Sequence, residues 1–132
     1  MKRVHFVCIG NCCRSQMAEG FARHLAASSI EASSSGLAPT REVAWETLAT
    51  MRASGVDISS QYPKKFDPYG TRDFDLIINM SGFDLPGQPE TTIEEWTVRD
   101  PYGESAAVYA GAATDIESRI QSLIQRLTNK PE

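Results

Sequence analysis

The residues best suited to chemistry lie in one short segment, residues 8–15, whose sequence is CIGNCCRS. Five residues separate Cys8 from Arg14, and Ser15 begins a predicted helix. A loop that curls around its own backbone N–H groups and leads into a helix N-terminus offers several donors to one tetrahedral oxyanion such as phosphate. The planar guanidinium of Arg14 can hold two oxygens of that anion at once. The residues predicted to form this oxyanion-binding loop are Ile9, Gly10, Asn11, Cys12, Cys13, Arg14 and Ser15.

Cys8 stands where the same backbone dipoles and the charge of Arg14 would stabilise a thiolate, the reactive form of the side chain. A hydrogen bond from Ser15 to this sulfur would make it a better leaving group when a thiophosphate is hydrolysed. Gly10 and Asn11 fit a tightly curled loop, because glycine and asparagine tolerate left-handed or strained backbone best. The segment therefore predicts nucleophilic catalysis by Cys8 at a bound oxyanion.

A second candidate for chemistry is the sequence Asp100-Pro101-Tyr102-Gly103. On its own it is typical of a turn, since Asp-Pro and Tyr-Gly are common turn dipeptides. A thiolate that displaces an alkoxide or phenolate from phosphorus needs a separate proton donor for the leaving oxygen. Together with the cysteine loop, this requirement favours Asp100 as a general acid.

The elements that must position these residues alternate between strands and helices. Apolar runs predict strands over residues 2–9, 30–35, 74–80 and 93–98. Helical spacing of apolar residues predicts helices over 15–26, from a Thr40 N-cap to 53, and from about 105 onwards. This alternation predicts an α/β fold whose parallel sheet is covered on both faces. Ligands bind such sheets outside the carboxyl ends of the strands, where strand order reverses, and the first strand ends at the cysteines.

Several side chains outside these motifs are interpreted as structural. Leu25 falls on the buried stripe of the first helix, and Trp45 and Trp96 are expected to pack in the core. His5 and His24 have no partner at a metal-ligand spacing and are interpreted as ordinary strand and helix residues.

Composition limits the classes of function. The chain has 132 residues, which predicts one domain over 1–132, and its 13 basic and 17 acidic side chains give a net charge of −4. That charge argues against nucleic acid or an anionic membrane as a partner. The three cysteines are too close together to staple distant parts of a secreted fold, so we expect a reducing compartment, the cytoplasm. We expect neither a metal nor an organic cofactor.

The sequence VCIGNCCRS at residues 7–15, with Asp100-Pro101-Tyr102 far downstream, resembles the low-molecular-weight protein tyrosine phosphatases. That family includes phosphatase-like arsenate reductases. The resemblance implies a three-layer α/β/α fold of flavodoxin-like type with a four-stranded parallel sheet. It also implies the roles of single residues: Cys8 as nucleophile, Arg14 as oxyanion ligand, Ser15 as a group that tunes the thiolate, Asn11 as a brace of the loop and Asp100 as general acid.

Three further residues take their expected roles from the resemblance. Tyr102 would line the mouth of the substrate pocket. Cys13 falls where many members carry a second cysteine that traps the oxidised nucleophile as a disulfide. Cys12 stands where the pocket rim is usually apolar, and it is either a small hydrophobic residue or a second redox partner.

Two enzymes remain, and the sequence favours one of them. Reductases that couple to thioredoxin carry two further cysteines after the strand matching 74–80, and residues 79–86 of this chain contain none. Tyr102 matches the phosphatases. We therefore favour a cysteine-dependent phosphatase that hydrolyses phosphotyrosine proteins or small aryl phosphates through a phosphocysteine.

Two alternatives stay open. One is an arsenate reductase that uses an external small thiol or a glutaredoxin-type donor. The other is a catalytically idle protein that binds anions or senses oxidants. In the two enzymes inorganic phosphate, arsenate and vanadate are the expected anionic ligands of the loop.

Overall fold

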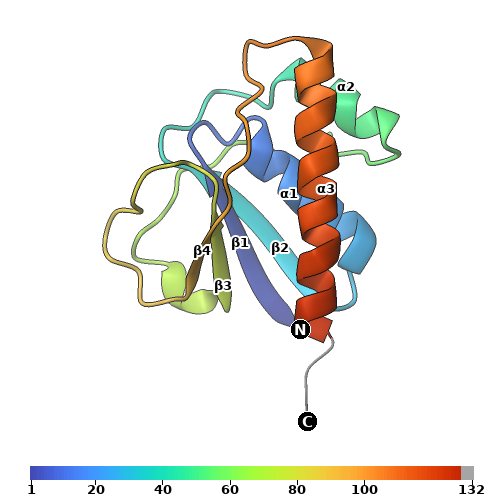
Figure 1. Cartoon of the computed structure of the whole chain (residues 1–132). Helices are drawn as coiled ribbons and strands as arrows, with labels where there is room; N and C mark the ends of the chain where they lie inside the picture. The colour runs from blue at the N-terminus through green and yellow to red at the C-terminus, as the bar shows by residue number, and fades with distance from the viewer. Residues whose placement is uncertain (129–132) are drawn as a thin grey trace.

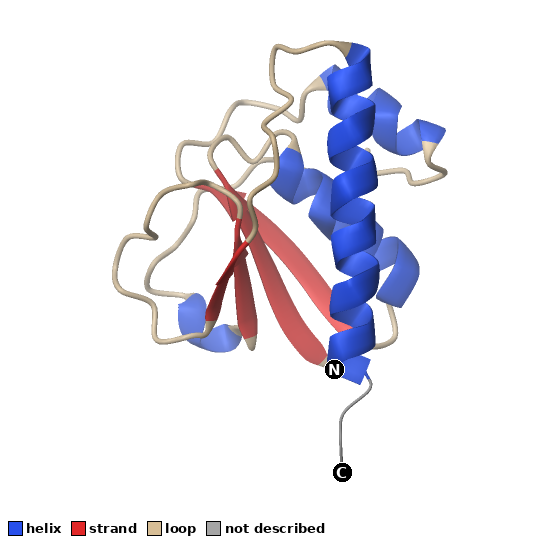
Figure 2. Cartoon of the chain, viewed as in Figure 1, coloured by secondary structure: helices blue, strands red, loops and turns tan. Residues whose placement is uncertain are grey.

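Four parallel strands form one sheet at the centre of the computed structural model, which describes residues 1–128 (Figure 1). The strands are β1 (Lys2–Cys8), β2 (Ile30–Gly36), β3 (Leu76–Asn79) and β4 (Ile93–Glu95). Three α-helices, α1 (Arg14–Ala26), α2 (Trp45–Ala53) and α3 (Ala106–Thr128), and a 3₁₀ helix, η1 (Thr71–Asp73), complete the regular structure (Figure 2).

The strand order β2-β1-β3-β4 places β1 at the point where the order reverses. Cys8, the last residue of β1, pairs with Gly36 at the end of β2, and Val7 pairs with Asn79 at the end of β3. The loops that follow these three strands therefore meet at one edge of the sheet. This is the edge at which open α/β sheets bind their ligands.

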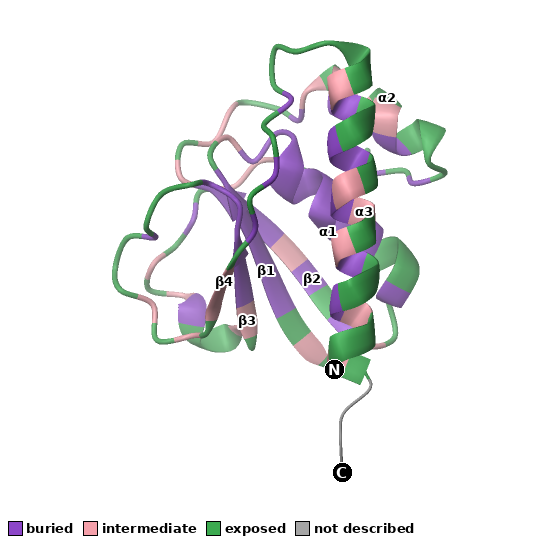
Figure 3. Cartoon of the chain, viewed as in Figure 1, coloured by how far each residue is buried: buried purple, intermediate pink, exposed green. Residues whose placement is uncertain are grey.

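The α-helices lie on one side of the sheet, where α1 and α3 cover its face and α2 packs against α1 and α3 (Figure 1). Their buried side chains form one core with alternate residues of the strands, and Figure 3 shows the corresponding buried stripe along α3. Each large apolar side chain buried here contributes about 2 kcal/mol to stability. The largest fully buried side chains of this core are Tyr109, Phe6, Phe21, Met17, Met51, Ile58, Ile78, Met80, Ile116, Ile120 and Leu123.

The opposite face of the sheet is covered mainly by loops. Val7 and Ile77 of the sheet pack there against Phe66 and Leu85, which lie in the loops before and after β3. The predicted α/β class and four-stranded parallel sheet are confirmed. Within residues 1–128 these loops contain one short helical element, the single turn η1.

The start of the second helix differs from the sequence-based prediction. The helix begins at Trp45, and the Thr40 hydroxyl donates to the Glu42 carbonyl rather than capping a helix. The preceding segment is held by bonds to the reactive loop, because the Thr40 N–H donates to the Gly10 carbonyl at 3.0 Å and the Ala44 N–H to the Cys12 carbonyl at 3.3 Å. These tertiary bonds outweigh the local helical spacing.

Smaller differences concern single side chains and element ends. Trp96 is buried as expected, whereas Trp45 is 71% exposed and Leu25 is 40% exposed, so neither belongs to the core. β1 ends at Cys8 instead of residue 9, and the last two strands are shorter than predicted. Among residues 1–128, none of the helices is both long and apolar enough to cross a membrane.

His5 is buried between two serines on the loop-covered face. Its Nδ1 lies 2.7 Å from Ser33 Oγ, its Nε2 lies 2.6 Å from Ser35 Oγ, and its ring stacks on Phe74 at 4.2 Å. Burial, assisted by the positive charge of Lys64, lowers the pKa of His5 to about 4. The side chain is therefore neutral in the folded protein at neutral pH.

We expect this histidine to make the protein less stable in mild acid. An unfolded histidine titrates near pH 6.5, so between about pH 6.5 and 4 the unfolded chain binds more protons than the folded one. Stability that is present above pH 6.5 is lost as the pH falls, by about 3 kcal/mol at pH 4. Urea unfolding at pH 7 and pH 4 should show this loss in the wild type and a smaller loss in His5→Gln. Equal losses in both proteins would contradict it.

Candidate active site

The loop between β1 and α1 is braced from inside by Asn11. This residue is fully buried and has a left-handed backbone with φ of 50°. Its Oδ1 accepts from the Lys64 backbone N–H at 2.9 Å, while its Nδ2 donates to Ser15 Oγ at 2.7 Å and to Ser34 Oγ at 3.0 Å. The structure therefore places Asn11 where a brace of the loop must lie.

The structural reason for glycine at position 10 differs from the one expected. The left-handed residue of the loop is Asn11, and Gly10 has no positive φ. A Cβ at Gly10 would lie 3.2 Å from Cys12 Sγ and 3.3 Å from Thr40 Cγ2. A side chain at Gly10 would thus crowd these two neighbouring side chains, whereas the backbone angles at this position do not call for glycine.

A directed chain of hydrogen bonds leads to the Cys8 sulfur. Ser15 Oγ already accepts a hydrogen bond from Asn11 Nδ2. Its own proton is therefore free to point at Cys8 Sγ, which lies 2.9 Å away. At the other end, Ser34 Oγ donates to the buried carboxylate of Glu19 at 2.6 Å. Cys8 also ends its strand just before the N-terminus of α1, whose first N–H groups have no intrahelical acceptor. The Ser15 proton and the N-terminus of α1 thus both bring partial positive charge near this sulfur.

Arg14 is held rigidly with part of its guanidinium unused. Its Nη1 donates to the carbonyls of Met80 at 2.6 Å and Val98 at 3.2 Å. Its Nε is buried and has no hydrogen-bond partner among residues 1–128. A buried N–H without an acceptor is costly, and an oxyanion in the pocket would supply the missing acceptor.

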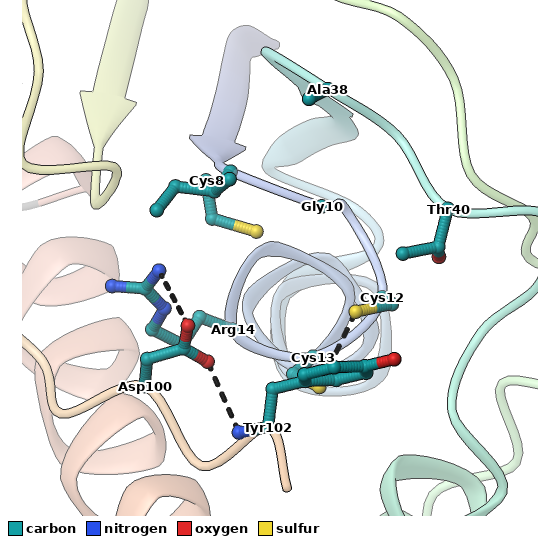
Figure 4. A pocket seen from close by; sticks show the side chains of 10 residues that line it. Cys8, Gly10, Cys12, Cys13, Arg14, Ala38, Thr40, Asp100 and Tyr102 are labelled. Atoms are coloured by element: carbon teal, nitrogen blue, oxygen red, sulfur yellow. Dashed lines mark hydrogen bonds and ion pairs between the residues drawn. The ribbon is translucent and has the colours of Figure 1, made fainter.

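Cys8 and Arg14 open into one pocket of about 180 Å³ at the carboxyl edge of the sheet (Figure 4). Asn11 and Ser15 lie behind it and are not among its lining residues. Ala38 and Thr40 were not predicted to line the pocket, and they reach it because the segment after β2 is hydrogen-bonded to the loop. The residues that line the pocket are Cys8, Ile9, Gly10, Cys12, Cys13, Arg14, Ala38, Thr40, Asp100 and Tyr102.

Asp100 forms the predicted turn and also faces the pocket. Its Oδ1 accepts from the Tyr102 N–H at 3.1 Å, and its Oδ2 lies 3.5 Å from Arg14 Nη2 (Figure 4). The carboxylate is about half exposed, so water and a leaving group can both reach it. Tyr102 is 61% exposed at the mouth, where the resemblance placed it.

Cys12 and Cys13 are free thiols in this pocket, with their sulfurs 3.6 Å apart. Cys13 Sγ also lies 3.6 Å from the hydroxyl of Tyr109 in α3. Hydrogen bonds from Cys12, Thr47 and Tyr109 lower the pKa of Cys13 to about 7, although burial opposes them. The same pairing and burial raise the pKa of Cys12. In residues 1–128 no cluster of three or more His, Cys, Asp or Glu side chains is arranged to hold a metal ion.

Similarity to known proteins identifies the family to which this chain belongs. A model of the family "Low molecular weight phosphotyrosine protein phosphatase" matches residues 3–85. The chain belongs to this family. The match contains the whole loop from Cys8 to Ser15 and ends before Asp100. Members of the family are enzymes, and this chain is one of them.

Individual relatives include both kinds of enzyme in the family. The glutaredoxin arsenate reductase of Synechocystis sp. is 36% identical over 132 residues, which cover 97% of this chain and all of that protein. A solved structure of an arsenate reductase in the phosphate-binding state has a TM-score of 0.90 and 37% identity, over 97% of this chain and 100% of the other. A low-molecular-weight protein tyrosine phosphatase from T. tengcongensis has a TM-score of 0.80 and 27% identity, over 95% and 99%.

The importance of Asn11 can be measured against a matched residue. Asn11→Ala should lower the free energy of unfolding by about 3 kcal/mol, because it adds left-handed strain and leaves buried hydrogen-bonding groups unpaired. Asn11→Gly tolerates the left-handed backbone but loses the same hydrogen bonds, so it should lose about 2 kcal/mol. Gln88, an exposed loop residue with φ of 49°, is the control, and Gln88→Ala should change the free energy of unfolding by less than about 0.5 kcal/mol, because both residues carry the same Cβ strain there.

Urea unfolding measures these three values, and the rate of Cys8 alkylation reports on the loop. Alkylation should slow in both Asn11 variants and stay unchanged in Gln88→Ala. A loss in Asn11→Ala no larger than in Gln88→Ala would mean that the hydrogen bonds of Asn11 do not brace the loop.

Proposed function

We propose that this protein is an arsenate reductase of the phosphatase-like type that depends on an external thiol. The proposal is carried by one observation: a Cys8 sulfur that accepts a directed hydrogen bond beside the unpaired Nε of Arg14. The choice of arsenate over phosphate esters is supported by the 36% identity to an arsenate reductase along almost the whole chain. This was the alternative interpretation of the sequence, and the relatives support it better than the main one.

The first step is attack by the Cys8 thiolate on arsenate. Arsenate is a tetrahedral oxyanion with the same charge and nearly the same shape as phosphate. Arg14 and the loop N–H groups would therefore hold its oxygens. A sulfur–arsenic bond forms and one arsenic–oxygen bond breaks, and the departing oxygen leaves as water after it takes a proton. Asp100, which lines the same pocket, is the donor for that proton.

The second step needs another thiol. A thiolate that attacks the Cys8 sulfur displaces arsenite, and the two electrons of the sulfur–arsenic bond remain on arsenic and reduce it from As(V) to As(III). The products are arsenite and a disulfide that includes Cys8. A second external thiol then attacks this disulfide and returns Cys8 to its reduced form.

The composition of the chain supports an external donor. Its three cysteines are all in the loop, and the segment after β3 contains none that could carry the oxidation away from the pocket. A small thiol such as glutathione, or a glutaredoxin, would therefore complete the cycle. Such donors fit the reducing cytoplasm that the sequence predicts.

A phosphatase is the second candidate, favoured by Asp100 and Tyr102 at the mouth of the pocket. A general acid is needed most when the leaving group is a poor one such as an alkoxide or phenolate, and an exposed aromatic ring can pack against a substrate ring. The 27% identity to a protein tyrosine phosphatase fits this alternative. Both activities begin with Cys8 and Arg14, so assays must distinguish them.

The decisive experiment compares the two activities in the same preparation. Arsenate-dependent oxidation of NADPH should occur with glutathione, glutathione reductase and glutaredoxin, and should exceed hydrolysis of para-nitrophenyl phosphate. Cys8→Ser should abolish both activities while circular dichroism stays that of the wild type. Rapid aryl phosphate turnover, with no arsenate-dependent oxidation of any thiol donor, would assign the protein to the phosphatases instead.

The proton donor can be tested separately with aryl phosphates. Asp100→Asn should slow substrates with poor leaving groups by about 100-fold and activated substrates much less, since a good leaving group departs without a proton. Asp84→Asn is the matched control, because Asp84 is an exposed carboxylate that does not line the pocket. Equal losses on all substrates would remove Asp100 from this role.

A further inference from the structure

Two thiols that the reaction does not use as nucleophile lie side by side in the catalytic pocket. The sulfurs of Cys12 and Cys13 are 3.6 Å apart, and both residues line the pocket with Cys8. Figure 4 shows Cys12 toward Thr40 and Cys13 near the middle of the view, with Arg14 and Asp100 on the other side. The guanidinium and the pair of thiols thus line different parts of one pocket.

The spacing of the pair suits a single thiophilic atom. Two thiolates bound to one centre by bonds of about 2.3 Å have sulfurs about 3.5 to 3.8 Å apart, depending on whether the angle at the centre is pyramidal or tetrahedral. The observed 3.6 Å falls within this range. Within the part of the chain that the structure describes, no third ligand completes a metal site. The fitting ligand is therefore an atom that prefers sulfur and brings its remaining oxygen ligand with it.

We propose that Cys12 and Cys13 form a dithiol site for trivalent arsenic. Arsenous acid carries three hydroxyl groups on arsenic. Two arsenic–oxygen bonds break, two arsenic–sulfur bonds form, and the two thiol protons leave in two molecules of water. Arsenic stays As(III) throughout, so no oxidant or reductant is needed, and one hydroxyl remains as the third ligand.

The substrate and the product then bind to different groups within the pocket. Arsenate is an anion and is held by Arg14 and the backbone N–H groups. Arsenous acid is uncharged at neutral pH and gains little from a guanidinium, so the pair of thiols binds it instead. The lowered pKa of Cys13, about 7, supplies the thiolate that attacks first, and the protonated Cys12 supplies a proton to the departing hydroxyl.

The consequence for turnover rests on the proposed function. Arsenite formed at Cys8 is retained in the same pocket by Cys12 and Cys13 until an external thiol exchanges with it. The product therefore inhibits the next cycle, and a higher concentration of the thiol donor relieves the inhibition. The dithiol site itself requires no catalytic activity.

Binding of sodium arsenite to the Cys8→Ser variant is the direct test, since this variant keeps only Cys12 and Cys13 as thiols. Intact mass spectrometry should show one arsenic per chain, and a thiol reagent should find both remaining thiols protected. Cys8→Ser/Cys12→Ser and Cys8→Ser/Cys13→Ser each retain one thiol and should bind at least about 100-fold more weakly, because the second bond is no longer intramolecular.

A second measurement uses the unmodified protein, so it holds even if a variant fails to fold. Wild-type protein treated with arsenite is alkylated under native conditions, and trypsin releases residues 4–14, which contain all three cysteines. Fragmentation should find Cys8 alkylated and Cys12 and Cys13 protected. Protection of Cys8 with Cys13, or of no cysteine, would overturn the dithiol site.

The outcomes for this site and for the proposed function are distinct. A protein that reduces no arsenate but binds arsenite through Cys12 and Cys13 contradicts the proposed function and supports the dithiol site. A protein that reduces arsenate but leaves both thiols open to alkylation supports the function and overturns the site.

Discussion

The hydrogen bond from the Lys64 backbone N–H to Asn11 Oδ1 determines the arrangement of the reactive loop. A backbone N–H can only donate, so it decides which end of the Asn11 amide faces it. The other end must then donate to Ser15 and Ser34, and each of these hydroxyls has one proton left to give. Those protons point toward Cys8 and Glu19. A single group 53 residues away in the sequence thus sets the direction of the hydrogen bonds that link Asn11, Ser15 and Ser34 to Cys8 and Glu19.

The two chemistries of this family share the same first half, which is why the pocket by itself does not distinguish them. Both begin with a thiolate that attacks a tetrahedral oxyanion held by one arginine and a ring of backbone donors. They diverge in the fate of the modified sulfur, which is attacked by water in one case and by a thiol in the other. What differs structurally is therefore the supply of the second nucleophile, and in this chain the only internal thiols lie in the anion loop itself.

The sequence predicted those features that depend on local pattern. β1 was recognisable because both of its faces are buried, and the segment from Cys8 to Ser15 because a curled loop needs particular residues at close spacing. The start of α2 and the exposure of Trp45 were not predictable, since bonds from Thr40 and Ala44 to the loop override the helical spacing. Contacts between distant residues, such as Tyr109 with Cys13, leave no trace in a single sequence.

The anchoring of Arg14 by the Met80 and Val98 carbonyls ties the reactive loop to segments that are far from it in the sequence. The guanidinium is fixed only while the segments that follow β3 and β4 are docked beside the end of β1. Local unfolding or cleavage of either segment would release the guanidinium and leave the nucleophile without its cationic neighbour. Catalytic competence is therefore a property of the assembled sheet and not of the short segment that carries the reactive residues.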